Sequence, residues 1–111
     1  MRDFKELISM DMIDTFIKDN ELAMLYISKP NCSVCHSLLP QIQNLMDHYP
    51  KIKLAQVNVE NVPEIAGHYS IFTVPVLLIF LNGKEYIREA RIVHLQLLDE
   101  KIKKLYDNVT Q

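Results

Sequence analysis

The sequence predicts an α/β domain in which helices cover both faces of a mixed β-sheet. Two unbroken apolar runs of strand length, at residues 22–28 and 76–81, are typical of strands buried on both faces. Helical spacing of apolar residues between the early strands favours parallel pairing, because a parallel connection needs a long crossover. Asn82-Gly83 predicts a tight hairpin, which makes the last two strands antiparallel.

The first helix follows a short opening segment. Residues 4–8 predict either a short first strand or the start of a helix. Ser9 is a candidate N-cap for the helix that follows, and Asp19-Asn20 ends it. The apolar stripe of this helix consists of Met12, Ile13, Phe16 and Ile17.

A second helix is expected from about Ser33, after Pro30 ends the preceding strand. Pro40 lies inside this helix and is expected to kink it, and Tyr49-Pro50 ends it. The apolar face of the helix is made by Leu38, Leu39, Ile42, Leu45, Met46 and Tyr49.

The rest of the chain completes the sheet. Residues 52–59 alternate as a strand, and Pro63 suits the first turn of a short helix that ends at about His68. The charged segment 84–92 is the expected antiparallel edge partner in the hairpin. The last helix has its apolar face on Leu95, Leu98, Ile102, Leu105 and Val109. We therefore expect one domain, residues 1–111, with a mixed central sheet of about five strands flanked by four helices.

Composition and charge narrow the function classes. The net charge is −2 with no basic run and no acidic tail, which argues against nucleic acid or an anionic membrane as a partner. No stretch reaches the ~20 apolar residues that a membrane span requires. Residues 1–10 mix charges and lack the apolar core of a secretory signal, so we expect a cytoplasmic protein. In that reducing compartment a C-x-x-C pair indicates a metal or redox site rather than a permanent structural disulfide.

The two cysteines of the chain, Cys32 and Cys35, stand at the junction of a buried strand and a helix. The unpaired N–H groups and the dipole at a helix start favour a thiolate at Cys32. Cys35 lies one turn further into the helix and is expected to be more buried. An attacking thiolate beside a second thiol makes a dithiol redox centre, in which a mixed disulfide forms and the second thiol releases the product.

Three other interpretations fit the same cysteines. Cys-Ser-Val-Cys-His matches the C-x-x-C-H pattern of haem attachment, although that attachment normally follows export. The two cysteines can also be small buried hydrophobes. A zinc site would need about four ligands. The histidines that could complete one, although none form an H-x₃₋₅-H pair, are His36, His48, His68 and His94. The residues alone leave these alternatives open.

Thr73-Val74-Pro75 directly precedes the buried strand at residues 76–81. Proline is disfavoured inside a central strand, so Pro75 belongs at the first residue of that strand. Some X-Pro bonds are cis, usually in tight turns. Taken alone, this segment is best explained as an ordinary strand-start proline.

Together, these motifs resemble the thioredoxin family over essentially the whole chain. The shared features are C-x-x-C at a helix start, Pro40 five residues after Cys35, Thr-Val-Pro before a buried strand, the Asn-Gly hairpin and a final amphipathic helix. The resemblance implies a five-stranded thioredoxin fold with Cys32 as the nucleophile and Cys35 as the resolving thiol. It also implies a cis Val74-Pro75 bond packed against the disulfide, in a loop whose backbone pairs with an extended substrate segment.

The sequence departs from the family pattern around this centre. The replacements are Ser28 and Asn31 for the active-site tryptophans, Ser33-Val34 for the common Gly-Pro, Tyr26 for the buried acid, Gln56 for its lysine partner, and Arg91 for the glycine after the edge strand. We therefore expect a divergent thioredoxin-like protein that has an altered docking surface and lacks the proton-handling pair of the family.

Three further side chains have two interpretations each. His36, four residues after Cys32, either supports the thiolate as a cation or is a solvated surface histidine. Tyr26 either takes part in proton transfer or is a core residue whose hydroxyl is hydrogen-bonded. Phe72 either forms an apolar docking patch near Cys32 or belongs to the core.

The function that we expect is a thiol–disulfide oxidoreductase that reduces protein or small-molecule disulfides through Cys32 and Cys35. Its other site residues are Val74, Pro75 and Phe72 for substrate binding, and Ser33, Val34, His36 and Tyr26 as modulators. We expect no cofactor or metal, and a monomer whose partners are a disulfide substrate and a reductase or small-thiol electron donor. The alternative is a thioredoxin-fold binding module with little turnover, which the missing acid–lysine pair favours.

Overall fold

The computed structural model describes residues 1–110 and has the predicted order of elements. The ambiguous segment at residues 4–8 contains a strand, not a helix start. The elements are β1 (Lys5–Leu7), α1 (Met10–Asp19), β2 (Leu22–Ser28), α2 (Ser33–Leu45), the 3₁₀ helix η1 (Met46–His48), β3 (Lys53–Asn58), α3 (Ile65–His68), β4 (Val76–Leu81), β5 (Lys84–Ala90) and α4 (Leu95–Thr110). Among residues 1–110, no helix is both long and apolar enough to cross a membrane.

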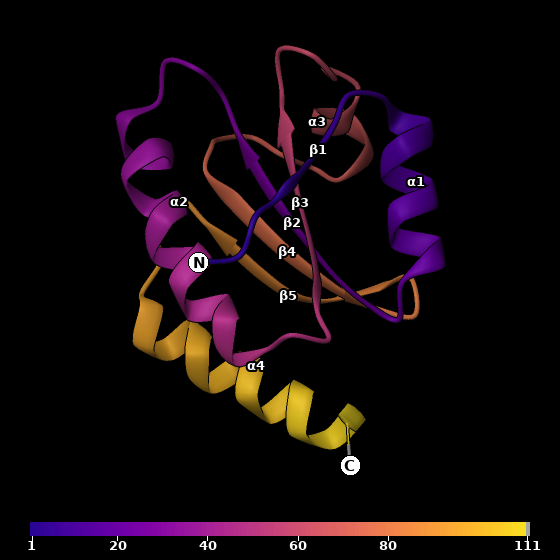
Figure 1. The fold of residues 1–111 in the computed structure, drawn as a ribbon. Helices are drawn as coiled ribbons and strands as arrows, with labels where there is room; N and C mark the ends of the chain where they lie inside the picture. The colour runs from indigo at the N-terminus through magenta and orange to yellow at the C-terminus, as the bar shows by residue number, and fades with distance from the viewer. Residues whose placement is uncertain (111) are drawn as a thin grey trace.

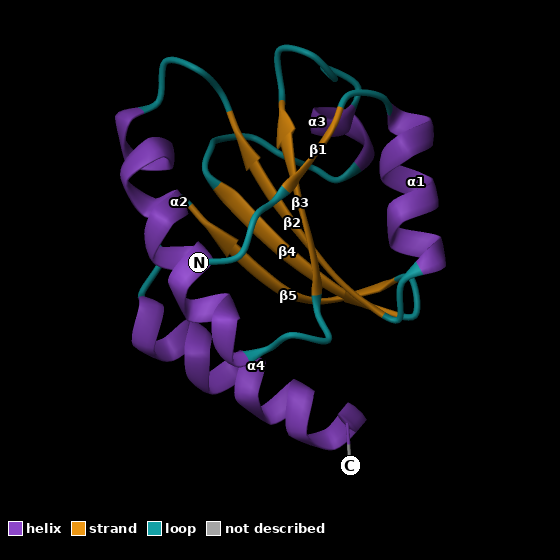
Figure 2. Cartoon of the chain, viewed as in Figure 1, coloured by secondary structure: helices purple, strands orange, loops and turns teal. Residues whose placement is uncertain are grey.

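The five strands form one mixed sheet in the order β1-β3-β2-β4-β5. β1 and β2 each pair with β3 in parallel, whereas β4 runs antiparallel to β2 and β5 antiparallel to β4. Helices α2 and α4 lie on one face of the sheet, and α1 and α3 lie on the other (Figures 1 and 2). The parallel crossovers and the terminal hairpin are the connections that the sequence predicts.

Each face of the sheet packs into its own apolar core. Strand β2 is central, so its residues 22–27 are all buried and alternate between the two cores. Burial of one large aliphatic side chain contributes roughly 1.5–3 kcal/mol, and these two layers supply most of the driving force for folding. The core under α2 and α4 includes Leu22, Met24, Tyr26, Ile42, Leu77, Leu98 and Ile102. The core under α1 and α3 includes Ile13, Ile17, Leu25, Val57, Ile65 and Leu78.

The hairpin between β4 and β5 has the predicted turn chemistry. Asn82 and Gly83 have φ angles of 51° and 83°, and two successive left-handed residues make a type I′ turn. A bulge follows, because Ile79 pairs with Ile87 but Phe80 pairs with Glu85, which leaves Tyr86 as the extra residue. The bulge increases the local twist of this edge strand.

Several boundaries differ from those predicted. β3 is one residue shorter at each end than the predicted 52–59, and α3 begins at Ile65, so Pro63 precedes it and does not lie in its first turn. Helix α2 runs through Pro40 and stops at Leu45 rather than at Tyr49, and the 3₁₀ helix η1 follows it. β5 ends at Ala90 rather than at residue 92, because Arg91 adopts a left-handed φ of 68° that no strand residue has.

The start of the chain is fastened to the end of α2 by Arg2. Its guanidinium donates hydrogen bonds to the carbonyl oxygens of Met46 at 3.1 Å, Tyr49 at 2.8 Å, Pro50 at 3.3 Å and Ile52 at 2.7 Å. Two of these carbonyls also accept backbone N–H groups, that of Met46 from Tyr49 at 3.0 Å and that of Tyr49 from Ile52 at 3.1 Å, so Arg2 adds a second hydrogen bond to each. Arg2 therefore stabilises the connection between α2 and β3.

Candidate active site

Cys32 is the N-cap residue of α2. Strand β2 ends at Ser28, and three residues carry the chain to Cys32, whose extended backbone (φ −134°, ψ 95°) precedes the first helical turn. The Cys32 Sγ atom accepts a hydrogen bond from the backbone N–H of Cys35 at 3.1 Å. A sulfur in this position receives an N–H that the helix leaves unpaired, and it lies at the positive end of the helix dipole. Both effects stabilise negative charge on Cys32.

Cys32 and Cys35 form a disulfide, with Cα atoms 5.2 Å apart. Cys35 is 1% exposed, whereas Cys32 is half-buried. The expected order of burial is therefore confirmed. Cys32 is the sulfur that another molecule can reach first.

The segment before β4 lies beside the disulfide. The Val74-Pro75 peptide bond is cis, as the family resemblance implies. The backbone N–H of Arg91 donates to the carbonyl oxygen of Pro75 at 2.9 Å, which ties this segment to the end of β5. An open cleft of about 540 Å³ runs between the segment and the start of α2. Its lining residues are Lys29, Asn31, Cys32, Ser33, Val34, Phe72, Thr73, Val74, Pro75 and Arg91.

The cleft has an apolar rim. Phe72 is 90% exposed and Val34 is 54% exposed, both next to the half-buried Cys32 in the same cleft. The core interpretation of Phe72 is therefore wrong. An aromatic ring left in water at a cleft is typical of a surface that contacts other molecules.

His36 is an exposed residue of the first turn of α2. Its Nε2 atom lies 2.7 Å from the carbonyl oxygen of Pro30, a hydrogen bond that joins the β2–α2 connection to the helix. The ring therefore helps to hold this connection in place. His36 also lines a second, smaller cleft of about 220 Å³ that contains Glu6 and Gln56.

Tyr26 occupies the core directly beneath the cysteine pair. Its hydroxyl donates a hydrogen bond to the carbonyl oxygen of Cys35 at 2.6 Å, and its ring meets Phe4 edge-on with centroids 6.2 Å apart. Tyr26 is 1% exposed, and burial raises its pKa to about 12. The phenol is therefore protonated at neutral pH and already uses its proton. The structure therefore agrees with the interpretation of Tyr26 as a core residue whose hydroxyl is hydrogen-bonded.

The strand register aligns Tyr26 with the other replaced position. Tyr26 on β2 is the partner of Gln56 on β3, and Gln56 is in turn the partner of Glu6 on β1. Gln56 is half-buried. At the two positions where the family pattern has a buried acid and a lysine, this protein has a phenol and an amide, neither of which exchanges protons near neutral pH.

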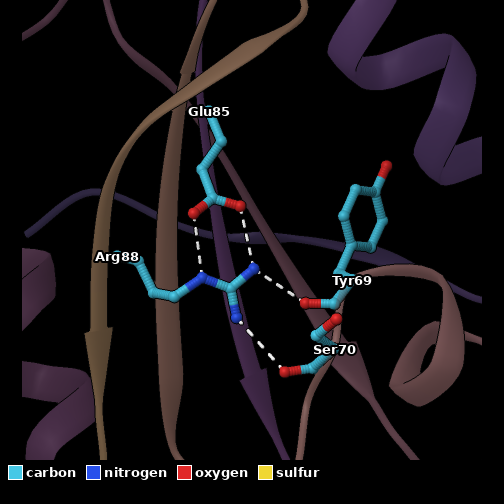
Figure 3. A network of polar contacts seen from close by, with 4 residues as sticks. All are labelled: Tyr69, Ser70, Glu85 and Arg88. Carbon is cyan, nitrogen blue, oxygen red and sulfur yellow. Dashed lines mark hydrogen bonds and ion pairs between the residues drawn. The ribbon is translucent and has the colours of Figure 1, made fainter.

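A polar network on β5 anchors the chain that leads into the cleft. Arg88 donates two hydrogen bonds of 2.8 Å to the carboxylate of Glu85, one of 2.7 Å to the carbonyl oxygen of Tyr69 and one of 3.3 Å to that of Ser70 (Figure 3). The hydrogen bonds from Arg88 hold the pKa of Glu85 below its ordinary value. Residues 69–70 are thereby fixed two residues before Phe72.

Sequence reasoning missed two contributors to the cleft. Lys29 and Arg91 line it together, although they are far apart in the chain. In the sequence Arg91 is distinguished only as a departure from the family's glycine, and a basic residue after an edge strand is the signal that points to it. Within residues 1–110, no three or more histidine, cysteine, aspartate or glutamate side chains are arranged to hold a metal ion.

Comparison with known proteins places these features in a family. The family model described as Thioredoxin matches residues 5–104. The chain therefore belongs to the thioredoxin family, and its cysteine pair is of the kind that supports thiol–disulfide exchange.

Individual relatives agree with this assignment. The thioredoxin-like protein YdfQ of Bacillus subtilis is 46% identical over 106 residues, which span 96% of this chain and 95% of that protein. A thioredoxin of Chlamydia pneumoniae is 25% identical over 99 residues, or 89% of this chain and 96% of that protein. Among solved structures, the thioredoxin of Plasmodium falciparum has a TM-score of 0.81 at 23% identity, over 90% of this chain and 97% of that one. The thioredoxin of Fasciola hepatica has a TM-score of 0.82 at 23% identity, over 91% and 98%. The two structures show that the fold is shared.

Proposed function

We propose that the protein reduces disulfides of proteins or small molecules through Cys32 and Cys35. The observation that carries this proposal is the half-buried Cys32 at a helix start, bonded to a buried Cys35 and facing an open cleft. An accessible sulfur with a second sulfur behind it is the arrangement that thiol–disulfide exchange requires.

The reaction consists of two exchanges. The Cys32 thiolate attacks one sulfur of the substrate disulfide, the substrate S–S bond breaks, and the departing thiolate takes a proton from water. The Cys35 thiol then loses its proton, and its thiolate attacks Cys32 Sγ. The mixed disulfide breaks, the second substrate thiolate leaves and is protonated, and Cys32–Cys35 is oxidised. The substrate has gained two electrons and two protons, which a thiol donor must return to the protein.

The cleft supplies the contacts for this reaction. Val74 and Pro75 present backbone groups to an extended substrate segment, and Phe72 contacts its apolar side chains. Ser33 and Val34 form the outer surface of the cysteine turn. His36 holds the β2–α2 connection through the Pro30 carbonyl.

The second exchange has no proton acceptor at position 26, where Tyr26 stands. Its hydrogen bond to the Cys35 carbonyl keeps the helix start in place but offers no base for the Cys35 proton. We propose that the protein works as a monomer in the cytoplasm, where a reductase or a small thiol restores the dithiol.

A second candidate is a thioredoxin-fold binding module with little turnover. The phenol of Tyr26 and the amide of Gln56 favour it, because they leave Cys35 without a nearby proton acceptor among the family positions. In this case the cleft would bind partners and the cysteines would contribute little.

Turnover of a fluorescence-quenched peptide disulfide separates the two candidates. Dithiothreitol supplies the electrons, and its direct reaction with the peptide is subtracted. The wild type is expected to accelerate reduction, Cys32→Ser to abolish the acceleration, and Cys35→Ser to accumulate a protein–peptide mixed disulfide that mass spectrometry detects. Peptide binding without acceleration by the wild type would favour the binding module.

A further inference from the structure

The cleft beside Cys32 is positively charged although the whole chain is negative. The chain has 12 lysines and arginines against 14 aspartates and glutamates. The cleft contains Lys29 and Arg91 and is lined by neither an aspartate nor a glutamate. In the described range 1–110, the salt bridges that form involve neither of these two side chains. Their charges therefore remain available to a molecule that enters the cleft.

The backbone conformation of Arg91 is energetically unfavourable for a residue that carries a side chain. Its φ of 68° lies in the left-handed region, which is unfavourable for a residue with a Cβ atom and free for glycine. The structural task of the position is a backbone hydrogen bond, from Arg91 N–H to the Pro75 carbonyl at 2.9 Å, which a glycine would make equally well. Residues with strained backbones cluster at functional sites. The guanidinium is what arginine offers at this position that glycine does not.

We infer that Arg91, together with Lys29, makes this site prefer disulfides whose cysteine is flanked by aspartate or glutamate on an extended segment. This inference rests on the proposed function and names its substrate class. A backbone hydrogen bond holds Arg91 beside Pro75, and both residues line the cleft. A substrate segment that pairs with the Val74-Pro75 backbone would therefore carry the residues next to the substrate cysteine past the Arg91 guanidinium. Phe72 provides apolar contact that does not depend on charge.

The preference acts through binding and leaves the chemistry unchanged. The substrate disulfide still receives two electrons from the cysteine pair, and Arg91 exchanges neither electrons nor protons. An exposed ion pair changes an equilibrium by roughly two- to fivefold, so an acidic neighbour should accelerate the reaction by about that factor for each pair. The factor should shrink at high salt, because exposed charges are screened.

Three peptides test the inference. They are identical except that glutamate, glutamine or lysine stands next to the disulfide-bonded cysteine. Reduced protein is mixed with each oxidised peptide, and the rate of a single turnover is divided by the rate for dithiothreitol, an uncharged dithiol. This division removes differences in the intrinsic reactivity of the peptides. We expect the wild type to favour the glutamate peptide over the lysine peptide by at least roughly two- to fivefold at low salt.

Arg91→Gln and Lys18→Gln each remove one positive charge, and comparing them locates the effect. Arg91→Gln should bring the glutamate-to-lysine rate ratio towards one, whereas Arg91→Lys keeps the charge and should retain most of the ratio. Lys18→Gln is the control, because Lys18 precedes β2 whereas Cys32 follows it, so the two lie at opposite ends of the sheet. This control should keep the wild-type ratio. If Arg91→Gln folds poorly, Arg91→Gly takes its place, since glycine suits the left-handed backbone.

The outcomes distinguish a failure of the acidic preference from a failure of the proposed function. If the wild type reduces all three peptides at one normalised rate, the acidic preference is overturned and the proposed function stands. If Lys18→Gln lowers the ratio as much as Arg91→Gln does, overall charge is responsible and the role of Arg91 is overturned. If the wild type reduces none of the peptides, the proposed function itself fails.

Discussion

The second exchange should be slow near neutral pH and should accelerate steeply as pH rises. The Cys35 thiol must lose its proton before it can attack, and the side chain that donates to its carbonyl oxygen is a phenol whose pKa burial raises to about 12. For any thiol whose pKa is about 8.5 or higher, the thiolate fraction rises about eight- to tenfold between pH 7 and pH 8. We therefore expect resolution of the mixed disulfide to become about eight- to tenfold faster over that unit of pH, since its rate follows the thiolate fraction.

Dipyridyl disulfide gives a direct assay of this step. The reduced protein is loaded at acidic pH, where Cys32 forms a mixed disulfide with one pyridylthio group and Cys35 stays protonated. A stopped-flow jump to higher pH then starts resolution, and each protein releases one further thiopyridone that absorbance records. The rate is measured at several pH values between about 6 and 9, which span the ordinary cysteine range.

Two substitutions at one position show whether Tyr26 sets the profile. Tyr26→Phe keeps the shape of the ring and removes the hydrogen bond to Cys35, so it should lower the free energy of unfolding by about 1 kcal/mol and leave the pH profile unchanged. Tyr26→Asp introduces a carboxylate that can accept the Cys35 proton, so it should flatten the profile. It should also cost several kcal/mol, because it leaves a void and an unpaired buried charge.

Fast, pH-independent resolution in the wild type would refute this reasoning. It would mean that another group accepts the proton, and Glu6 and His36 in the second cleft would be the first to substitute. A profile that changes in Tyr26→Phe would show that the phenol takes part after all. Both outcomes can be read even if Tyr26→Asp does not fold.

Three further predictions concern stability and are checked by chemical denaturation. Ser9→Ala should lower the free energy of unfolding by about 1 kcal/mol, because the Ser9 hydroxyl oxygen caps α1 by accepting the N–H of Met12 at 3.1 Å; no loss would show that water replaces the cap. Arg2→Ala should cost roughly 1–3 kcal/mol, the scale for hydrogen bonds from a charged group to carbonyl oxygens, and an unchanged stability would show that these hydrogen bonds make no net contribution. Glu85→Gln should cost at most about 1 kcal/mol above pH 5, as expected for a half-exposed ion pair. Because Arg88 lowers the folded-state pKa of Glu85, the contribution of this carboxylate is complete above its unfolded pKa and is lost as pH falls through the folded value. The difference between wild type and Glu85→Gln should therefore vanish in acid, and a constant difference down to pH 2 would contradict the assignment.

The features that sequence predicted well are those decided by local chemistry. Asn82-Gly83 can form a type I′ turn in almost any context, and the apolar run at residues 22–28 is too hydrophobic for anything but the centre of the sheet. The position of Cys32 at a helix start follows from the same kind of local pattern. In these elements the local propensity, the hydrophobic pattern and the tertiary packing all favour the same structure, so one sequence is enough to predict them.

The features that sequence missed depend on which particular atoms meet once the elements are packed. The partner of the Tyr26 hydroxyl is a carbonyl on another element, and the partner of the His36 ring is a carbonyl on the preceding turn. The charge of the cleft depends on Lys29 and Arg91, which are far apart in the chain and line the same cleft. No periodicity or motif encodes such meetings, because they are set by how the helices pack on the sheet.

The segment that carries Phe72 is held at both of its ends. Arg88 donates to the carbonyls of Tyr69 and Ser70 on one side (Figure 3). On the other side, the backbone N–H of Arg91 donates to the carbonyl of Pro75. A segment fixed in this way has few conformations left to lose when it meets another molecule, so little ordering entropy opposes the encounter. Pre-organisation of this kind lets a small contact area recognise a partner without holding it for long. Brief, specific encounters are what a protein needs if it is to release each partner after a single exchange.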